Sequence, residues 1–322
     1  MQVRFINAAD IRRVLTFERC IDLMRHAMSL DSAAARQPIR QTLSSPGLPG
    51  SLSIMPGFIA NPARLGMKVV SVFADAPHGS HQGFVLIFDT RDGTPLAILD
   101  GGEITAIRTA AATAVATDVL ARRDVRTLAI CGYGEQAASH LRALPLVRRF
   151  ERILIWGRDF EKAQRFAESQ ARLVNCCLSA VRSLDEAAAA DVICTATAAS
   201  EPFFHSGLLR PGHHLNVVGS SIPTTSEIDI ETVARSRFYV DLNESALALA
   251  GDFLRASHAG RVSDDHIVGS IGDVIDGRAA GRTSAADITL FKSLGMISED
   301  LVAADYVMRM AAEQGLGQLV DW

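Results

Sequence analysis

The stretch "RTLAICGYGEQAASH", residues 126–140, decides the fold. An apolar run of strand length leads into Gly132 and Gly134, and a helical pattern follows directly. Gly132 permits a tight turn, Gly134 lets a pyrophosphate approach the backbone, and Ala137 stands where the third glycine of the GxGxxG/A motif falls. The N–H groups that open the helix would attract the phosphates. The stretch predicts a dinucleotide-binding turn, the alternative being a glycine turn that holds no ligand.

Strand and helix patterns alternate after this turn. Apolar runs of strand length recur at 152–158, 191–198, 214–220 and 237–243, with helical patterns between them. Such alternation is typical of a parallel sheet with helices on both faces. We therefore predict an α/β fold with a Rossmann-type, doubly wound parallel sheet over residues 122–296.

The residues before the turn follow a different pattern. Apolar positions have a helical period over 10–35, and an alanine-rich helix is expected over 103–121. Between them lie strand-like runs separated by turn residues, at 50–58, 65–73, 82–90 and 95–101. The last segment, 297–322, is expected to be helical and to return to this part of the chain. Residues 1–121 with 297–322 are thus predicted to form a separate α+β domain.

Composition excludes several classes of protein. The chain has 322 residues, enough for two domains, with 48% hydrophobic and 21% charged residues, as in ordinary globular proteins. A net charge of −4 without a Lys/Arg-rich block gives no general attraction to nucleic acid or to anionic membranes. No apolar run approaches the ~18 residues that a membrane helix needs. We therefore expect a cytoplasmic protein with neither nucleic acid nor membrane as a partner.

The five cysteines do not indicate a metal site. They show no CxxC or Cys/His spacing, and Cys176 and Cys177 are adjacent. We expect buried free thiols in a reducing compartment and no bound metal.

The end of the second strand distinguishes between nicotinamide cofactors. Enzymes that use NAD usually place Asp or Glu there, where it binds the ribose 2′-hydroxyl. Here Gly157 stands near the expected acid and Arg158 follows. The planar guanidinium of Arg158 can pair with a 2′-phosphate, which favours NADP(H). Asp159 keeps NAD(H) as an alternative, and Arg158 could instead be a solvated surface charge.

The first domain contains isolated cations within or beside apolar segments. They are Arg40, Lys68 and Arg108. A lysine within an apolar strand is costly to bury without an anionic partner. If the three cations converge they would bind a carboxylate. The alternative is that Lys68 pairs with a structural acid.

Motifs along nearly the whole chain resemble those of the ornithine cyclodeaminase/mu-crystallin family. They occur in the family's order and spacing, and they are "LGMKVVS", "LDGGEITAIRTAAATAVAT", "CGYGEQA", "IWGRDFEKAQRFA", "LNVVGSSIP" and "FKSLGMISED". The resemblance implies a homodimer built through the first domain, which would therefore serve substrate binding and dimerisation. It also implies a substrate that lies between that domain and the nicotinamide.

The resemblance also assigns roles to individual residues. It implies that Arg40, Lys68 and Arg108 bind the substrate carboxylate. It matches His81 with a histidine that lies against the cofactor, although His81 could simply be a loop histidine. The cofactor contacts it implies are His81, Arg108, Thr109, Gly132, Gly134, Glu135, Gln136, Arg158, Thr197, Val218 and Lys292.

Two departures from the cyclodeaminase pattern indicate the reaction. Ser221 replaces an aspartate of those enzymes, and Ser53 stands where they have a glutamate that binds the distal amino group of the substrate. A serine hydroxyl cannot act as a general base at neutral pH without a partner. The mu-crystallin branch, which reduces cyclic ketimines, resembles this chain in having a serine at the strand end.

The leading hypothesis is therefore an NAD(P)H-dependent oxidoreductase of proline metabolism. It would reduce Δ1-pyrroline-2-carboxylate or Δ1-piperideine-2-carboxylate to L-proline or L-pipecolate, with Lys68 and Ser221 as catalytic residues and Ser53 beside the substrate. Ser221 would hydrogen-bond the imine nitrogen or a water that relays the proton. One alternative is an ornithine cyclodeaminase or an open-chain amino-acid dehydrogenase. Another is a non-catalytic protein that holds a small ligand.

Overall fold

The chain divides into two compact units. The computed structural model describes residues 2–30, 33–73, 76–77, 79 and 81–321. Unit 1 consists of Met1–Ala112 and Gly295–Trp322, and unit 2 consists of Thr113–Leu294. Helix α3 (Gly101–Leu120) runs through the boundary without a break. Within the described ranges, every helix is too short or too polar to cross a bilayer.

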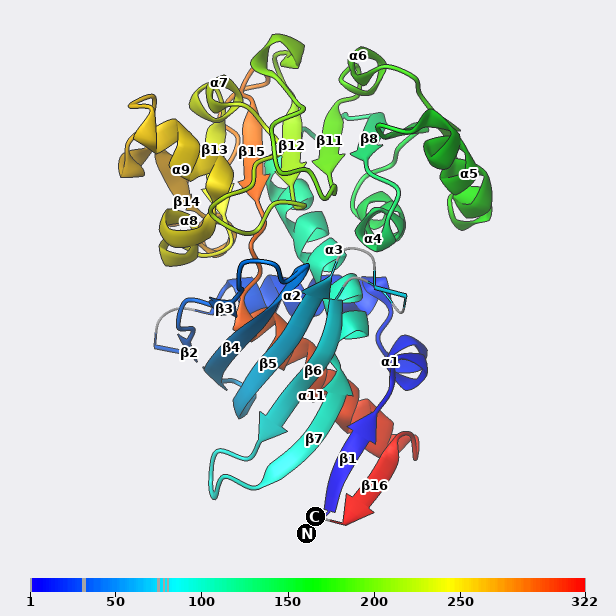
Figure 1. Ribbon diagram of the computed structural model, residues 1–322, viewed down its shortest axis with the longest axis vertical. Helices are drawn as coiled ribbons and strands as arrows, with labels where there is room; N and C mark the ends of the chain where they lie inside the picture. The colour runs from blue at the N-terminus through cyan, green and yellow to red at the C-terminus, as the bar shows by residue number, and fades with distance from the viewer. Residues whose placement is uncertain (1, 31–32, 74–75, 78, 80, 322) are drawn as a thin grey trace. The chain divides into compact units, whose positions relative to one another are not determined.

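Unit 1 is a mixed sheet with helices (Figure 1). Its strand order is β16-β1-β7-β6-β5-β4-β2, with β3 also paired to β4. All of these pairs are antiparallel except β1 with β7. Besides the start of α3, the elements are β1 (Gln2–Ile6), α1 (Ala8–Val14), α2 (Phe17–Met28), β2 (Ala35–Arg36), β3 (Gln41–Leu43), β4 (Gly50–Ala60), β5 (Ala63–Phe73), β6 (His81–Phe88), β7 (Pro95–Asp100), α11 (Ile297–Glu313) and β16 (Gln318–Asp321).

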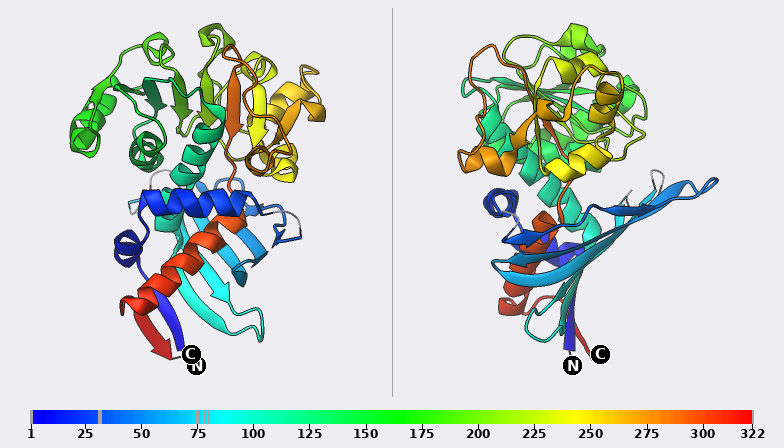
Figure 2. Two further views of the ribbon diagram at one scale, coloured as in Figure 1. Left: turned by 180° about the vertical axis from the view of Figure 1, so that it is seen from behind. Right: turned by 90° about the vertical axis from the view of Figure 1, so that its left-hand side faces the viewer.

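Helix α11 covers one face of this sheet. Figure 2 shows it lying along one side of the curved strands, and it contacts β4, β5 and β6. The approach is close because glycines face it. A Cβ on Gly57 would lie 2.4 Å from Ile297, and a Cβ on Gly66 would lie 2.4 Å from Leu301. The covered face therefore carries the alternate residues of β4 and β5 that are buried.

Unit 2 is an all-parallel sheet with the strand order β10-β9-β8-β11-β12-β15-β13-β14. Its elements are β8 (Thr127–Cys131), α4 (Glu135–Ala143), η1 (Leu144–Leu146), β9 (Arg152–Trp156), α5 (Phe160–Gln170), η2 (Ala171–Leu173), β10 (Cys177–Ala180), α6 (Leu184–Ala187), β11 (Val192–Thr195), η3 (Ser206–Leu208), β12 (His214–Val217), α7 (Ile230–Ala234), β13 (Arg237–Val240), α8 (Asn243–Leu249), α9 (Gly251–His258), η4 (Asp264–His266), β14 (Ile267–Ser270), α10 (Ile271–Ile275) and β15 (Thr289–Lys292).

The order of the strands in unit 2 reverses between β8 and β11. Strands β9 and β10 lie on one side of β8, and β11 and β12 lie on the other. Ligands of open α/β sheets bind outside the carboxyl ends of the strands at such a switch point. Strands β11, β12 and β15 are buried along their whole length, as in a sheet that is covered on both faces.

The predicted fold class is confirmed, with two local differences. The helical period over 10–35 forms two helices, because Thr16 begins a new one by accepting a hydrogen bond from the backbone N–H of Arg19. The segment expected to be helical to its end instead finishes in β16, which pairs antiparallel with β1.

Candidate active site

The predicted dinucleotide turn joins β8 to α4 in unit 2. Gly132 has a φ of +131°, and a Cβ there would lie 2.4 Å from the carbonyl oxygen of Ala196, at the end of neighbouring β11. Gly134 begins α4 as its N-cap, and this helix start has no side-chain cap. A Cβ on Gly134 would meet no atom within 4 Å, so the space in front of the helix start is open.

These residues fit the diphosphate of a dinucleotide. The first N–H groups of α4 lie at an end that no side chain caps, where an anion can bind them. Glu135 is exposed in the first turn of α4, and Gln136 is half-buried behind it. The side-chain oxygen of Gln136 is buried and has no hydrogen-bond partner among the described residues.

The end of β9 explains why an acid is missing there. A Cβ on Gly157 would lie 2.3 Å from Cε1 of Tyr133, so the ring of Tyr133 occupies the place of a side chain. Arg158 is exposed. Asp159 is the N-cap of α5 and accepts a hydrogen bond of 3.0 Å from the backbone N–H of Lys162.

In unit 1, two of the predicted cations share acids of α11. Lys68 Nζ lies 2.9 Å from Oδ1 of Asp300, and Arg108 Nε lies 3.1 Å from the same oxygen. Arg108 Nη1 also lies 2.8 Å from Oε2 of Glu299. Lys68 is only 2% exposed. We name Arg40, Lys68, Arg108, Glu299 and Asp300 together the cation cluster.

Arg40 and His81 interact electrostatically with this cluster. Burial lowers the pKa of Lys68 to about 8, an effect that Asp300 opposes and that Arg108 and Arg40 strengthen. Burial lowers the pKa of His81 to about 4, and Lys68, Arg108 and Arg40 lower it further. The imidazole of His81 is therefore neutral at neutral pH.

The pairing of β5 with β6 shows that Lys68 and His81 lie on the same face of the sheet. Val72 pairs with His81 and Lys68 pairs with Val85, so the side chains of Lys68 and His81 lie on the buried face. Ser53 is buried on the same face, and its hydroxyl lies 2.9 Å from that of Thr42 in β3. The residues next to Lys68 on this face are thus neutral.

Two further residues near Arg108 complete the local packing. Thr109, its neighbour in α3, is buried. Gly295 has a φ of +81°, and a Cβ there would lie 2.8 Å from Nη1 of Arg108. Glycine at this position leaves the room that the guanidinium occupies.

The strand-end segment 218–221 in unit 2 holds its two serines differently. Val218 and Ser220 are buried, whereas Ser221 is half-buried. The Ser220 hydroxyl donates a hydrogen bond of 2.7 Å to the carbonyl oxygen of Thr225. Ser221 rather than Ser220 is therefore the hydroxyl that a ligand of unit 2 could reach.

Behind this segment lies a buried group of ions. Lys292 is fully buried, its Nζ lies 2.7 Å from Oδ2 of Asp252, and it also donates to the carbonyl oxygen of Ser220. Glu227 accepts hydrogen bonds from Thr195 and Thr197. We name Glu227, Asp252 and Lys292 the strand-end network.

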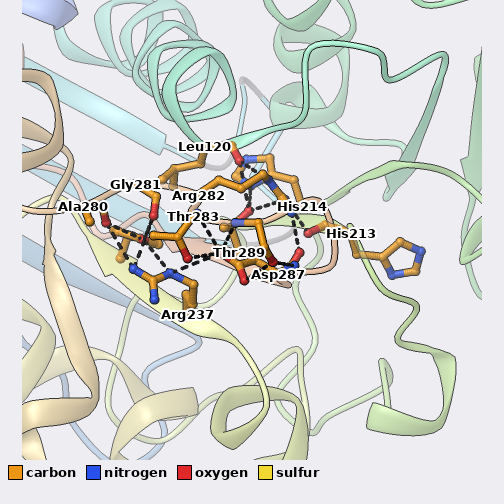
Figure 3. Close-up of polar contacts among 12 residues, drawn as sticks. Leu120, His213, His214, Arg237, Ala280, Gly281, Arg282, Thr283, Asp287 and Thr289 are labelled. Carbon is orange, nitrogen blue, oxygen red and sulfur yellow. Dashed lines mark hydrogen bonds and ion pairs between the residues drawn. The ribbon is translucent and has the colours of Figure 1, made fainter.

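The opposite edge of the same sheet carries a purely internal set of polar contacts (Figure 3). Arg282 donates to the carbonyl oxygens of Leu120 at 2.8 Å and His213 at 2.9 Å. It also donates to the hydroxyl of Thr289 at 2.8 Å. These contacts join the end of α3 to the amino ends of β12 and β15, away from the edge at which ligands of such sheets bind.

The acids of either buried group could not be identified from the sequence. Glu299 and Asp300 lie 191 and 232 residues from the cations that they bind. The signal available was the adjacent acid pair in "FKSLGMISED", which lies in the first turn of α11. Glu227 and Asp252 gave no local signal, because each stands alone between apolar or small residues.

Free cysteines occur in both units. Cys20, Cys131 and Cys194 are buried, and burial raises the pKa of each thiol. Cys176 is half-buried and Cys177 is exposed, so the expectation of buried thiols is wrong for Cys177. No group of three or more metal-binding side chains occurs within the part of the chain that the structure describes.

Known proteins resemble the chain over almost its full length. A Δ1-pyrroline-2-carboxylate reductase of Bacillus cereus is 33% identical over 323 residues, covering 98% of this chain and 99% of the relative. The ketimine reductase mu-crystallin of Mus musculus is 37% identical over 274 residues, covering 84% of each chain.

A solved structure has the same fold over nearly the whole chain. Δ1-pyrroline-2-carboxylate reductase of Thermococcus litoralis, in complex with NADH and L-proline, superposes with a TM-score of 0.95 at 31% identity, covering 98% of this chain and 99% of that one. The family model of the ornithine cyclodeaminase/mu-crystallin family matches residues 2–315. The protein therefore belongs to the ornithine cyclodeaminase/mu-crystallin family.

Proposed function

We propose that the protein is an NAD(P)H-dependent reductase of a cyclic imino acid. Its substrate would be Δ1-pyrroline-2-carboxylate or the six-membered Δ1-piperideine-2-carboxylate, and its product L-proline or L-pipecolate. Relatives that cover nearly the whole chain carry this kind of activity in their names. Unit 1 would bind the substrate and unit 2 the cofactor.

The balance of charge in the cation cluster is the observation that carries the proposal. Arg40, Lys68 and Arg108 bring three positive charges, and Glu299 and Asp300 bring two negative ones, which leaves one positive charge to face the carboxylate group of a ligand. Oδ2 of Asp300 is also buried, and among the described residues it has no hydrogen-bond partner. A cyclic iminium carboxylate offers both an anion and an N–H donor.

The cluster can therefore bind and orient the substrate. Its cations hold the carboxylate, and the ring N–H would donate to Oδ2 of Asp300, which keeps the imine protonated and electrophilic. A bound nicotinamide supplies a hydride to the C=N carbon, so that imine, proton and hydride together give the secondary amine. Neutral His81 adds no further charge beside the carboxylate. For Ser221 we propose a hydrogen bond to the ring nitrogen or to a water that relays the proton.

The dinucleotide would be held by the turn and strand ends of unit 2. Gly134 leaves open space for its diphosphate, Gly132 lets the turn pack against the end of β11, and the start of α4 supplies N–H groups. Lys292 is fully buried, so we assign it an indirect role through Ser220. The other proposed contacts are His81, Arg108, Thr109, Glu135, Gln136, Arg158, Thr197 and Val218.

The serines at positions 53 and 221 argue against cyclodeamination. Buried Ser53 pairs with the hydroxyl of Thr42 and cannot neutralise the distal ammonium of ornithine. Ser221 offers a hydroxyl where ammonia loss would need a base. A ring without a distal ammonium therefore suits the serines at positions 53 and 221 better than ornithine does.

Direct assays distinguish these reactions. We expect NADPH absorbance to fall when Δ1-pyrroline-2-carboxylate or Δ1-piperideine-2-carboxylate is added. Ammonia release from ornithine with catalytic NAD⁺ and no net change in cofactor absorbance would identify a cyclodeaminase instead. Reduction of NAD⁺ by alanine would identify an open-chain dehydrogenase. Binding of the imino acid without turnover would identify a ligand-binding protein.

For the cofactor we propose NADP(H) ahead of NAD(H). Arg158 is exposed after β9, where it can reach a 2′-phosphate, and the carboxylate of Asp159 already caps α5. We expect Arg158→Ala to raise the KM for NADPH about 10-fold and to leave that for NADH unchanged, since one charge-assisted hydrogen bond contributes about 1.5 kcal/mol or more. Arg165→Ala, an exposed change in α5, is the control. An unaltered NADPH constant in Arg158→Ala would contradict the assignment.

We further propose that the working protein is a homodimer joined through the uncovered face of the unit 1 sheet. Leu65 of β5 is 48% exposed and Phe84 of β6 is 56% exposed. Both belong to the alternate residues that face away from Lys68, and Leu52 of β4 continues the same face. A sheet face of this kind, apolar across three neighbouring strands, suits a second copy of itself.

Sizing experiments test the dimer. We expect the unaltered chain to sediment as a dimer, and Phe84→Lys to sediment as a monomer because a charge would be buried at the interface. Leu173→Lys places the same charge on an exposed residue of unit 2, and it should leave the dimer intact. A dimer that survives Phe84→Lys would place the interface elsewhere.

A further inference from the structure

Glu227 joins the ends of two neighbouring parallel strands with one buried carboxylate. Its Oε2 accepts hydrogen bonds of 2.7 Å from the hydroxyl of Thr195, at the end of β11, and from the backbone N–H of Gly219, after β12. Its Oε1 accepts bonds of 2.8 and 2.7 Å from the backbone N–H and the hydroxyl of Thr197. Strands β11 and β12 are paired in register, so this side chain closes their carboxyl edge.

The rest of the strand-end network holds Glu227 and its segment in place. Oδ1 of Asp252 accepts hydrogen bonds from the backbone N–H of Glu227 at 2.8 Å and from the hydroxyl of Ser226 at 2.6 Å. Lys292 pairs with the other oxygen of Asp252 and donates to the carbonyl oxygen of Ser220. Both ends of the segment 219–227 are therefore fixed by buried ionic groups.

The segment 219–227 is tightly packed at Gly219. A Cβ on Gly219 would lie 2.1 Å from the carbonyl oxygen of Thr197 and 2.6 Å from Oε1 of Glu227. The strand ends thus meet around the carboxylate at van der Waals distance, and a shift of one of them must move the other.

A carboxylate is the group that these contacts require. Four donors converge on Glu227, and only a carboxylate offers acceptors in every direction, whereas an amide would turn an NH₂ group toward some of them. Burial raises the pKa of Glu227, and Lys292 opposes that effect. Buried ions contribute little net stability, so the network is better explained by the geometry that it fixes.

We propose that Glu227 is a positioning residue for imine reduction, which sets Thr197, Val218 and Ser221 in place without touching substrate or cofactor. These three residues, which we assigned to the cofactor and to the proton, lie on the strand ends that Glu227 joins or in the segment beside them. The reaction part of this proposal rests on the proposed function. The cofactor part does not.

Glu227→Gln tests the proposal, with Glu231→Gln as the matched control. Glu231 is a surface residue of α7, four positions after Glu227, and it pairs with Arg261. For Glu227→Gln we expect kcat with Δ1-pyrroline-2-carboxylate to fall about 10- to 100-fold, as for a misplacement on the order of 1 Å, while the KM for the imino acid stays within about twofold. The NADPH dissociation constant, measured by fluorescence titration, should rise about fivefold or more. Glu231→Gln should match the unaltered enzyme.

Each outcome decides between positioning and a merely structural role. A folded Glu227→Gln with unchanged kcat and unchanged NADPH dissociation constant overturns the proposal, and so does a variant with a lower Tm whose folded fraction keeps the normal kcat. If Glu227→Gln does not fold, Thr195→Val removes one donor and keeps the carboxylate. It should lower kcat about 3- to 10-fold, and no change there would equally overturn the proposal.

The experiment also separates this proposal from the proposed function. If the unaltered protein reduces neither cyclic imine, the proposed function is wrong. The NADPH dissociation constants of Glu227→Gln, Thr195→Val and the unaltered protein still decide whether Glu227 positions the strand ends.

Discussion

The cation cluster of unit 1 and the strand-end network of unit 2 both bury ion pairs, but their charges balance with opposite sign. The cluster has three cations and two acids, whereas the network has Lys292 and the two acids Glu227 and Asp252. In the network, hydroxyl and backbone donors satisfy Glu227 and Oδ1 of Asp252, and Oδ2 of Asp252, which has no hydrogen bond among the described residues, lies 2.7 Å from Nζ of Lys292. In the cluster, Oδ2 of Asp300 has no such donor among the described residues.

We infer from this difference that the cluster can hold a ligand, whereas the network stabilises the protein itself. Buried polar groups that are fully satisfied make a region rigid and specify one geometry. A surplus charge with an unfilled acceptor is instead typical of a binding site. The two regions bury similar residues, and what distinguishes them is whether the chain itself completes the hydrogen bonds.

The largest expected effect concerns stability, in the two lysine variants Lys292→Met and Lys68→Met. Lys292→Met leaves Asp252 buried without a cation, and we expect a loss of about 3–5 kcal/mol in the free energy of unfolding. Lys68→Met leaves Asp300 paired with Arg108, so the loss should be about 1–2 kcal/mol. Urea denaturation measures both.

For substrate binding the order of the two variants should be reversed, with the larger effect in Lys68→Met. Lys68→Met should raise the KM for the imino acid about 30-fold or more, because it removes one carboxylate partner. Equal losses of stability, or an unchanged KM in Lys68→Met, would remove the distinction between the two regions.

An intermediate effect is expected on the pH dependence. The pKa of Lys68 is lowered from 10.5 to about 8, so between these values the unfolded chain binds more protons than the folded one. The contribution of Lys68 to stability therefore rises with pH across this window. Substrate binding should change in the opposite sense, because above about pH 8 neutral Lys68 leaves the cluster without its surplus charge.

Enzyme kinetics across pH test this expectation. The KM for the imino acid should rise above about pH 8, and Lys68→Arg should abolish the rise because a guanidinium stays protonated there. His81, with a pKa of about 4, should not contribute in this range. A rise that persists in Lys68→Arg would mean that another group titrates.

The smallest expected effect is that of removing the hydrogen bond between the hydroxyls of Thr42 and Ser53. Thr42→Val removes the hydroxyl partner of Ser53 and should cost about 1 kcal/mol in unfolding free energy. All charges of the cluster remain, so the KM for the imino acid should change by less than about fivefold. A change as large as that of Lys68→Met would show that the hydroxyl pair binds the carboxylate too.

Local patterns in the sequence predicted the elements that repeat a period or end in a turn. Strand β5 and helix α3 appeared where expected because apolar and small residues mark them. Strands β1 and β16 gave no such signal. They are short, and they stabilise each other by pairing Gln2 with Asp321 at opposite ends of the chain.

The site was predictable as residue types but not as contacts. Lys68 and Arg108 stood out because cations are costly in apolar segments. Their shared carboxylate, Asp300, could not be identified, because only folding brings a residue 232 positions away within 2.9 Å of Lys68. Whether a buried charge belongs to a ligand or to the protein depends on such distant partners.

The contact between Tyr133 and Gly157 restricts how cofactor preference could evolve. An acid at 157, the usual step toward NAD, would place its Cβ 2.3 Å from the Tyr133 ring. An acid there therefore requires the Tyr133 ring to move or a smaller residue to replace it. Substitutions at 133 and 157 are thus expected to be coupled, so that the effect of a change at one position depends on the residue at the other.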